Sequence, residues 1–145
     1  MNIFDVIGKI AGKQVVRVIA GGSNGSIIVL KIGNQEFSIS IKCVWRLEHK
    51  GRVIAGWNES NDAIKGNLTI QAKALTGEMI ERIEISNLYD MKVYFLGDKI
   101  LNVFCDVTPN YEPHSYDENW VISDIIENIS YVASKNFEIL TRPYE

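Results

Sequence analysis

The sequence predicts an α+β fold with antiparallel sheets, in which two copies of a helix–strand–strand–strand unit pack with pseudo-twofold symmetry. Three observations lead to this prediction. Apolar residues occupy every second position of residues 37–47, which is the period of a strand with one buried face. Gly33 with Asn34, and Gly97 with Asp98, are typical of two-residue hairpin turns. The apolar pattern of the first half recurs about 65 residues further along the chain.

The first half begins with a short helix and continues in strands. Asn2 is a suitable N-cap, apolar residues follow at helical spacing, and Gly12 suits the C-terminal stop. Residues 14–20 are rich in β-branched side chains and predict a strand, and the glycine-rich residues 21–25 predict the turn that ends it. Further strands of this half are expected at 26–32, 37–49 and 52–57.

The second half repeats this order. Residues 58–77 predict a loop and then a helix that stops at Gly77, and strands are expected at 78–85, 91–96 and 99–107. The positions that match between the halves, about 65 residues apart and then about 64 past the hairpin, are Gly12 with Gly77, Val15 with Ile80, Val18 with Ile83, Ile28 with Val93, Leu30 with Phe95, Gly33 with Gly97, Phe37 with Leu101, Ile39 with Val103, and Ile41 with Cys105.

A polar insert at residues 108–119 distinguishes the second copy from the first. Pro109 and Pro113 cannot donate to a strand ladder, so the insert is expected to be a loop before a strand resumes at Trp120.

The C-terminal residues predict a strand hairpin that turns at 134–136; a helix capped by Asp124 is the alternative. The chain is therefore expected to form a single domain over residues 1–145, with the internal repeat at about 2–57 and 61–123.

The alternating residues are expected to form the core, which leaves any function to the opposite face of the strands or to the insert. The side chains expected to be buried are Phe37, Ile39, Ile41, Trp45, Leu101, Val103 and Trp120.

Composition limits the location and the partners. Apolar runs fall well short of the roughly 20 residues that span a bilayer, and the N-terminus lacks a basic region followed by a long apolar stretch. We therefore expect a cytoplasmic protein with no membrane partner. The net charge of −3 argues against a nucleic-acid partner.

The charge is unevenly distributed. Residues 100–134 contain six Asp or Glu and no Lys or Arg, whereas residues 1–99 carry a net positive charge. If these carboxylates share one face, they would attract a basic partner or a cation. A solvated acidic surface that aids solubility is the alternative.

Two cysteines, Cys43 and Cys105, lie in alternating apolar runs and lack the spacing of a metal or redox motif. They are expected to be small core residues, with a disulfide or a reactive thiol as the alternative.

No strong catalytic motif is present, so we expect a protein that is not an enzyme and needs no cofactor. His114 precedes Asp117 and Glu118 in the insert, and these side chains could hold a metal or transfer protons; a polar loop is the favoured interpretation. Arg46 could bind an anion or pair with a carboxylate such as Asp90, and a structural ion pair is favoured. The candidate binding residues are Arg46, Glu112, His114, Tyr116, Asp117 and Glu118.

One set of positions between residues 12 and 123 forms a recognisable pattern: Trp45, Arg46, Leu47, Gly56, Asp62, Gly77, Glu118 and Trp120. In this pattern the chain resembles a small bacterial family of unknown function. These positions are mostly structural, so the resemblance implies a fold more than an activity and brings no catalytic residues. Some relatives lie near contact-dependent or polymorphic toxin systems, which implies an immunity-like role.

The function expected from these features is that of a non-enzymatic binding protein, immunity-like, whose acidic residues 106–127 engage a basic protein such as a nuclease toxin. The alternative is a small-ligand binding module with a pocket between the two repeats. An enzyme centred on His114, Asp117 and Glu118 is the third hypothesis, and a homodimer is a further partner to consider.

Overall fold

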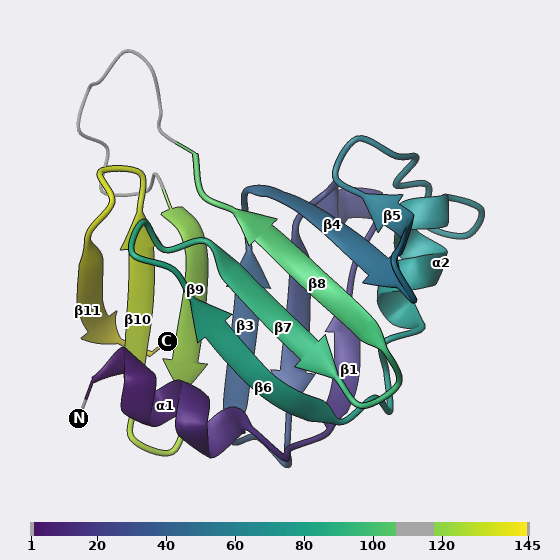
Figure 1. Cartoon of the computed structure of the whole chain (residues 1–145). Coiled ribbons are helices and arrows are strands. Elements are labelled where there is room, and N and C mark those ends of the chain that lie inside the picture. Colours follow the sequence, from purple (N-terminus) through teal and green to yellow (C-terminus); the bar gives the residue numbers. More distant parts are fainter. Residues whose placement is uncertain (1, 107–117, 145) are drawn as a thin grey trace.

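The computed structural model describes residues 2–106 and 118–144. Two antiparallel sheets pack face to face, and α1 (Ile3–Ile10) and α2 (Asn67–Lys73) lie at their margins (Figure 1). The predicted class, α+β with antiparallel sheets, is confirmed in its broad terms. The proportions differ from the prediction, because the protein is largely a β-sandwich.

The first sheet has six strands and the second has five, and neighbouring strands in each are antiparallel. In spatial order the first sheet contains β1 (Val15–Ile19), β2 (Ile28–Ile32), β3 (Phe37–Ile41), β9 (Glu118–Asp124), β10 (Ile129–Ser134) and β11 (Ile139–Pro143). The second contains β5 (Arg52–Gly56), β4 (Val44–His49), β8 (Lys99–Phe104), β7 (Met91–Phe95) and β6 (Ile80–Ile85).

Each sheet takes strands from both halves of the chain. The chain leaves the first sheet after β3 and enters the second at β4, and it crosses back between β8 and β9. The predicted self-contained helix–strand–strand–strand units are therefore not separate layers of the fold. The single strand predicted over 37–49 is also wrong, because Lys42 and Cys43 carry the crossing between two strands.

The crossing leaves the apolar alternation intact. Phe37, Ile39 and Ile41 on β3 and Trp45 and Leu47 on β4 are all buried. The apolar side chains of β3 and of β4 both point into the space between the sheets. One unbroken alternation of apolar and polar residues therefore serves a strand in each sheet. The sequence pattern alone cannot distinguish one long strand from two strands joined in this way.

The core lies between the sheets, and all of the side chains predicted to be buried are buried there. Trp45 and Trp120 are among the largest fully buried residues. The indole N–H of Trp45 donates to the carbonyl of Ser26 at 2.8 Å, and that of Trp120 donates to the carbonyl of Tyr89 at 2.8 Å. Each buried indole therefore stabilises the fold without leaving a polar atom unpaired.

The helices close the margins of the sandwich. Asn2 and Asp5 form a capping box at the start of α1, which packs against β6. The helix buries Ile3, Val6, Ile7 and Ile10. The second helix packs against β5 and β1. Each helix thus contacts a strand of the other half of the chain.

The C-terminal residues form the predicted hairpin. β10 and β11 pair from Ile129 with Pro143 to Ala133 with Ile139. Asp124 ends β9 and caps a turn by accepting the N–H of Glu127 at 3.1 Å. The alternative of a helix beginning at Asp124 is therefore wrong.

Candidate functional site

The outer face of the first sheet, which points away from the core, carries a row of polar side chains directly opposite one another. Lys31 on β2 lies opposite Ser38 on β3, and Ser38 lies opposite Ser123 on β9. Ser123 lies opposite Ser130 on β10, which lies opposite Arg142 on β11. We call these five residues the polar row. It places a cation at each end of three hydroxyl groups.

A second row runs parallel to the polar row, two residues before it or after it on successive antiparallel strands, and is mostly aliphatic. Its members alternate with the core residues, so they share the outer face with the polar row. We call it the aliphatic row, and it consists of Ile19, Val29, Ser40, Val121, Val132 and Leu140.

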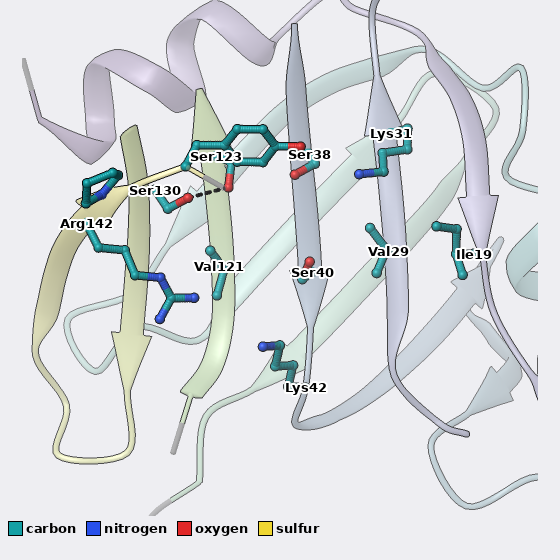
Figure 2. A pocket seen from close by; sticks show the side chains of 12 residues that line it. Ile19, Val29, Lys31, Ser38, Ser40, Lys42, Val121, Ser123, Ser130 and Arg142 are labelled. Carbon is teal, nitrogen blue, oxygen red and sulfur yellow. Dashed lines mark hydrogen bonds between the residues drawn. The ribbon is translucent and has the colours of Figure 1, made fainter. Parts of the chain in front are cut away.

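The polar row lines an open groove of about 580 Å³, together with Ile19, Val29, Ser40 and Val121 of the aliphatic row (Figure 2). The hydroxyl groups of Ser123 and Ser130 lie 2.7 Å apart, and these two serines and Ser38 are buried although they face away from the core. The three serines therefore form the floor of the groove, between longer side chains that line it. Residues Lys42, Pro143 and Tyr144 complete its lining.

A β-bulge at Asn119 sets the orientation of Glu118. Trp120 pairs with Ala133 and Glu118 with Ser134, so Asn119 is the extra residue. Its side chain is fully buried, accepts the N–H of Asp106 at 3.0 Å and donates to the Asp106 carbonyl at 3.0 Å. The bulge turns Glu118 toward the outer face, where its carboxylate meets Lys42 at 2.7 Å and Arg142.

The Glu118 carboxyl is held in its charged form. Burial opposes ionisation, but hydrogen bonds from Arg142 and Lys42 outweigh it, so the pKa of Glu118 lies below its ordinary value. Glu118 in turn fixes the two long basic side chains at the margin of the groove. Its role in the site is to position cations.

The groove is positively charged. Lys31, Lys42 and Arg142 line it, and no Asp or Glu among residues 2–106 and 118–144 does so. Glu118 neutralises one of these three charges, and no ion pair joins Lys31 to another described residue. A row of hydroxyl groups between cations is suited to holding an oxyanion, because ammonium and guanidinium groups give the stronger, charge-assisted hydrogen bonds.

Of the site residues that the sequence predicts, Glu112, His114, Tyr116 and Asp117 lie outside the described residues. The structure places Glu118 on the outer face of the first sheet, buried and paired.

Arg46 belongs to β4 in the second sheet, where its guanidinium lies 4.8 Å from the centre of the Phe104 ring. The structure therefore does not bring Arg46 and Glu118 together. The predicted partner Asp90 instead accepts the backbone N–H of Cys105 at 2.7 Å.

The acidic residues of the 100–134 run do not all contribute to an acidic surface. Asp124 is buried, and its carboxylate lies 3.3 Å from the Lys9 ammonium. Glu118 is neutralised by Lys42 and Arg142. Glu127 is exposed. The predicted acidic surface therefore lacks two of its carboxylates, those of Asp124 and Glu118, because both are buried and paired with basic side chains.

The groove residues were missed as a site by sequence reasoning, although one signal pointed to them. Ser38, Ser40 and Lys42 are the polar positions of the alternating stretch, which is the face to which function was assigned. Their partners Ser123, Ser130 and Arg142 lie far away in sequence, and only the exchange of strands between the sheets brings them alongside.

Within the described ranges, no three metal-binding side chains gather at one place, and no helix is long and apolar enough to cross a bilayer. The chain matches no protein-family model, no curated protein and no solved structure. The resemblance to a bacterial family therefore stays a prediction.

Proposed function

We propose that this protein is a non-enzymatic binding protein whose outer-face groove holds a small organic anion. The observation that carries the proposal is the composition of the groove. Three cations and a line of hydroxyl groups share it with an aliphatic row, and the carboxylates of the described residues do not line it. An oxyanion attached to a short apolar group is complementary to both rows.

The polar row supports the anionic part of the ligand. Lys31 and Arg142 stand at opposite ends of Ser38, Ser123 and Ser130. A carboxylate or a phosphate over these residues would accept hydrogen bonds from hydroxyl groups and from at least one cation. Such charge-assisted bonds are about twice as strong as neutral ones.

The aliphatic row supports the organic part. Val29, Val121 and Ile19 line the same groove beside the serines. Burial of an alkyl chain against them is favourable by about 0.8 kcal/mol for each fully covered methylene. A ligand with an apolar group should therefore bind more tightly than an inorganic anion.

Binding rather than catalysis is proposed because the described residues of the groove include no group that transfers protons at neutral pH. Among the described residues that line it there is no His, Cys, Asp or Glu. Serine is a weak nucleophile unless an adjacent base activates it.

The sign of the groove argues for a partner different from the one that the acidic residues suggested. A basic protein would be repelled by Lys31, Lys42 and Arg142. The immunity-like role therefore stays a prediction, and through this face it would need an acidic segment on the partner. The alternative small-ligand module is closer to our proposal, but with the ligand on one sheet rather than between the repeats.

The proposal can be tested by titrating the isotope-labelled protein with sodium hexanoate and following backbone amide shifts by NMR. We expect saturable shifts at Ser38, Ser123 and Ser130. Lys31→Gln should weaken them, because it removes from the groove a cation that forms no ion pair with any other described residue. Lys92→Gln is the matched control, since Lys92 is an exposed strand lysine of the second sheet. Shifts that are absent from the groove, or equal in both variants, would reject the proposal.

We also infer that the chain contains a duplication of a helix followed by five strands, with the last two strands of each copy exchanged into the other sheet. The strand orders support this inference, since β1-β2-β3-β9-β10 corresponds to β6-β7-β8-β4-β5. Both copies have a bulge at the same place in the first hairpin, between Val15 and Arg17 and between Ile80 and Arg82.

The pairing across these hairpins refines the match between the copies. Val15 pairs with Ile32 and Ile80 pairs with Phe95, so Ile32 corresponds to Phe95. The sequence pattern matched Leu30 to Phe95 instead. The loop before β7 is shorter than the loop before β2, and this difference shifts the correspondence by one period of the alternation.

A further inference from the structure

The two cysteines meet where the chain crosses between the sheets. The ladder of β4 and β8 ends with Val44 opposite Phe104, so the next residues along the two strands are Cys43 and Cys105. Residues directly opposite in an antiparallel pair have Cα atoms about 4.5–5.5 Å apart, which lies within the range that a disulfide spans. Both cysteines are free thiols.

The neighbouring groups hold the two thiols at this place. The Cys105 N–H donates to the Asp90 carboxylate at 2.7 Å, and its thiol donates to the Tyr89 carbonyl at 3.0 Å. Next to Cys43, the N–H of Lys42 donates to the Asn119 carbonyl at 2.8 Å. Hydrogen bonds on both strands therefore limit how far the thiols can separate.

We propose that Cys43 and Cys105 form a redox-active dithiol that closes to an intramolecular disulfide when a peroxide reaches Cys105. This proposal concerns a modification site and does not depend on the groove. Cys105 is the half-buried member of the pair, whereas Cys43 is buried. The oxidant therefore reaches Cys105 first. Cys43 lies beside it and acts as the resolving thiol.

The state of Cys43 agrees with this order. The hydrogen bond with Cys105 and then burial raise the pKa of Cys43 above its ordinary value, so it stays protonated and unreactive toward solutes. The Cys43 sulfur reacts only after Cys105 has been oxidised to a sulfenic acid.

The chemistry balances in two steps. The Cys105 sulfur attacks the peroxide and breaks its O–O bond; Cys105 becomes a sulfenic acid and one water leaves. The Cys43 sulfur then attacks the Cys105 sulfur, the S–O bond breaks, and the departing hydroxide takes the thiol proton to form a second water. The two thiols lose two electrons and two protons in total, and the peroxide is reduced.

The experiment treats the folded wild-type protein with a small excess of hydrogen peroxide, in the presence of dimedone, and measures the intact mass under denaturing conditions. We expect loss of two hydrogens, loss of both alkylatable thiols, and full recovery with a reductant. Cys43→Ala should instead accumulate a dimedone adduct at Cys105, because the resolving thiol is absent. Cys105→Ala should react much more slowly, because only the buried thiol remains.

Three outcomes would overturn the proposal: a dimedone adduct in the wild type as large as that in Cys43→Ala, both thiols persisting, or disulfide-linked dimers. The melting temperature gives a readout that needs no variant. Cross-linking a loop of about 60 residues should raise it by about 10 °C. An oxidised wild-type protein that melts no higher than the reduced one would contradict an unstrained bond between these thiols.

Discussion

At the scale of single residues, the margin of the groove depends on Glu118. Its carboxylate is buried and bonds to Lys42 and Arg142, both of which remain partly exposed. Its lowered pKa means that it favours the folded state at pH values above its ordinary value of 4.5, and that this contribution is lost as the pH falls through the folded value.

We expect Glu118→Gln to lower the free energy of unfolding at pH 7 by about 1–2 kcal/mol, because the two cations lose their shared partner and solvent screens them only in part. The deficit should shrink in acid, where the wild-type carboxyl is also neutral. Urea unfolding at pH 7 and pH 3 measures both values. Glu127→Gln, at an exposed acidic residue beyond the other end of β9, is the control, and an equal effect of the two substitutions would contradict this role.

Gly21 supports a close approach between the loop after β1 and α2. Its φ is +74°, and a Cβ there would lie 1.9 Å from the Thr69 hydroxyl, which is buried without a hydrogen-bond partner among the described residues. Gly21→Ala should therefore cost about 3 kcal/mol, from both the clash and the strained backbone. Gly25→Ala has a similar φ and open space, so about 1 kcal/mol is expected. Equal midpoints in urea would show that Thr69 moves aside.

At the scale of elements, the bulge in β9 connects the fold to the groove. Asn119 bonds both backbone groups of Asp106 and faces Ser134, whose carbonyl it reaches at 3.4 Å. This side chain holds the return crossing and turns Glu118 outward. The Asn119 carbonyl also accepts the N–H of Lys42 at 2.8 Å, so the side chain and the backbone together fix the extra residue.

Asn119→Ala should lower the free energy of unfolding by about 1–2 kcal/mol, because it removes the side-chain hydrogen bonds to the Asp106 backbone and to the carbonyl of the buried Ser134. It should also weaken hexanoate binding, since Glu118 would no longer position Lys42. Chemical unfolding and the NMR titration measure the two effects. Asn136→Ala in the exposed hairpin turn is the matched control and should change neither.

Most elements could be predicted from the sequence, because period-two alternation and turn residues are local properties. Asn2, Gly12 and the terminal hairpin fall where they were expected. The break at Lys42 and Cys43 could not be predicted, because the apolar side chains on either side of it point into the same core. The groove could not be predicted for a related reason. The sequence identifies Ser38 as a polar position of a strand, but only the pairing of β3 with β9 shows that Ser123 lies beside it.

At the scale of the whole molecule, the exchange of strands gives the two buried tryptophans matching environments. Trp45 pairs with Val103 and Trp120 with Ile41, and each indole donates to the loop before the second strand of its copy. Strands that are consecutive in sequence usually pair with each other in a sheet. The crossings at the ends of β3 and β8 are the exception.

Trp45→Phe and Trp120→Phe should therefore be similarly costly, about 1–3 kcal/mol each, because each removes the N–H donor of a part-buried hydrogen bond and leaves a small void. Urea unfolding of the two variants measures this. A near-silent substitution at one site and a severe one at the other would contradict equivalent roles for the two halves.

The groove depends on single residues, on the bulge in β9 and on the exchange of strands between the sheets. Calorimetric titration with hexanoate and acetate tests most directly whether it binds an organic anion. We predict that hexanoate binds about tenfold more tightly than acetate, because its chain covers the aliphatic row, and that Lys31→Gln weakens hexanoate about three- to tenfold while Lys92→Gln does not. No heat of binding for hexanoate, or equal affinities for the two anions and the two variants, would contradict the account.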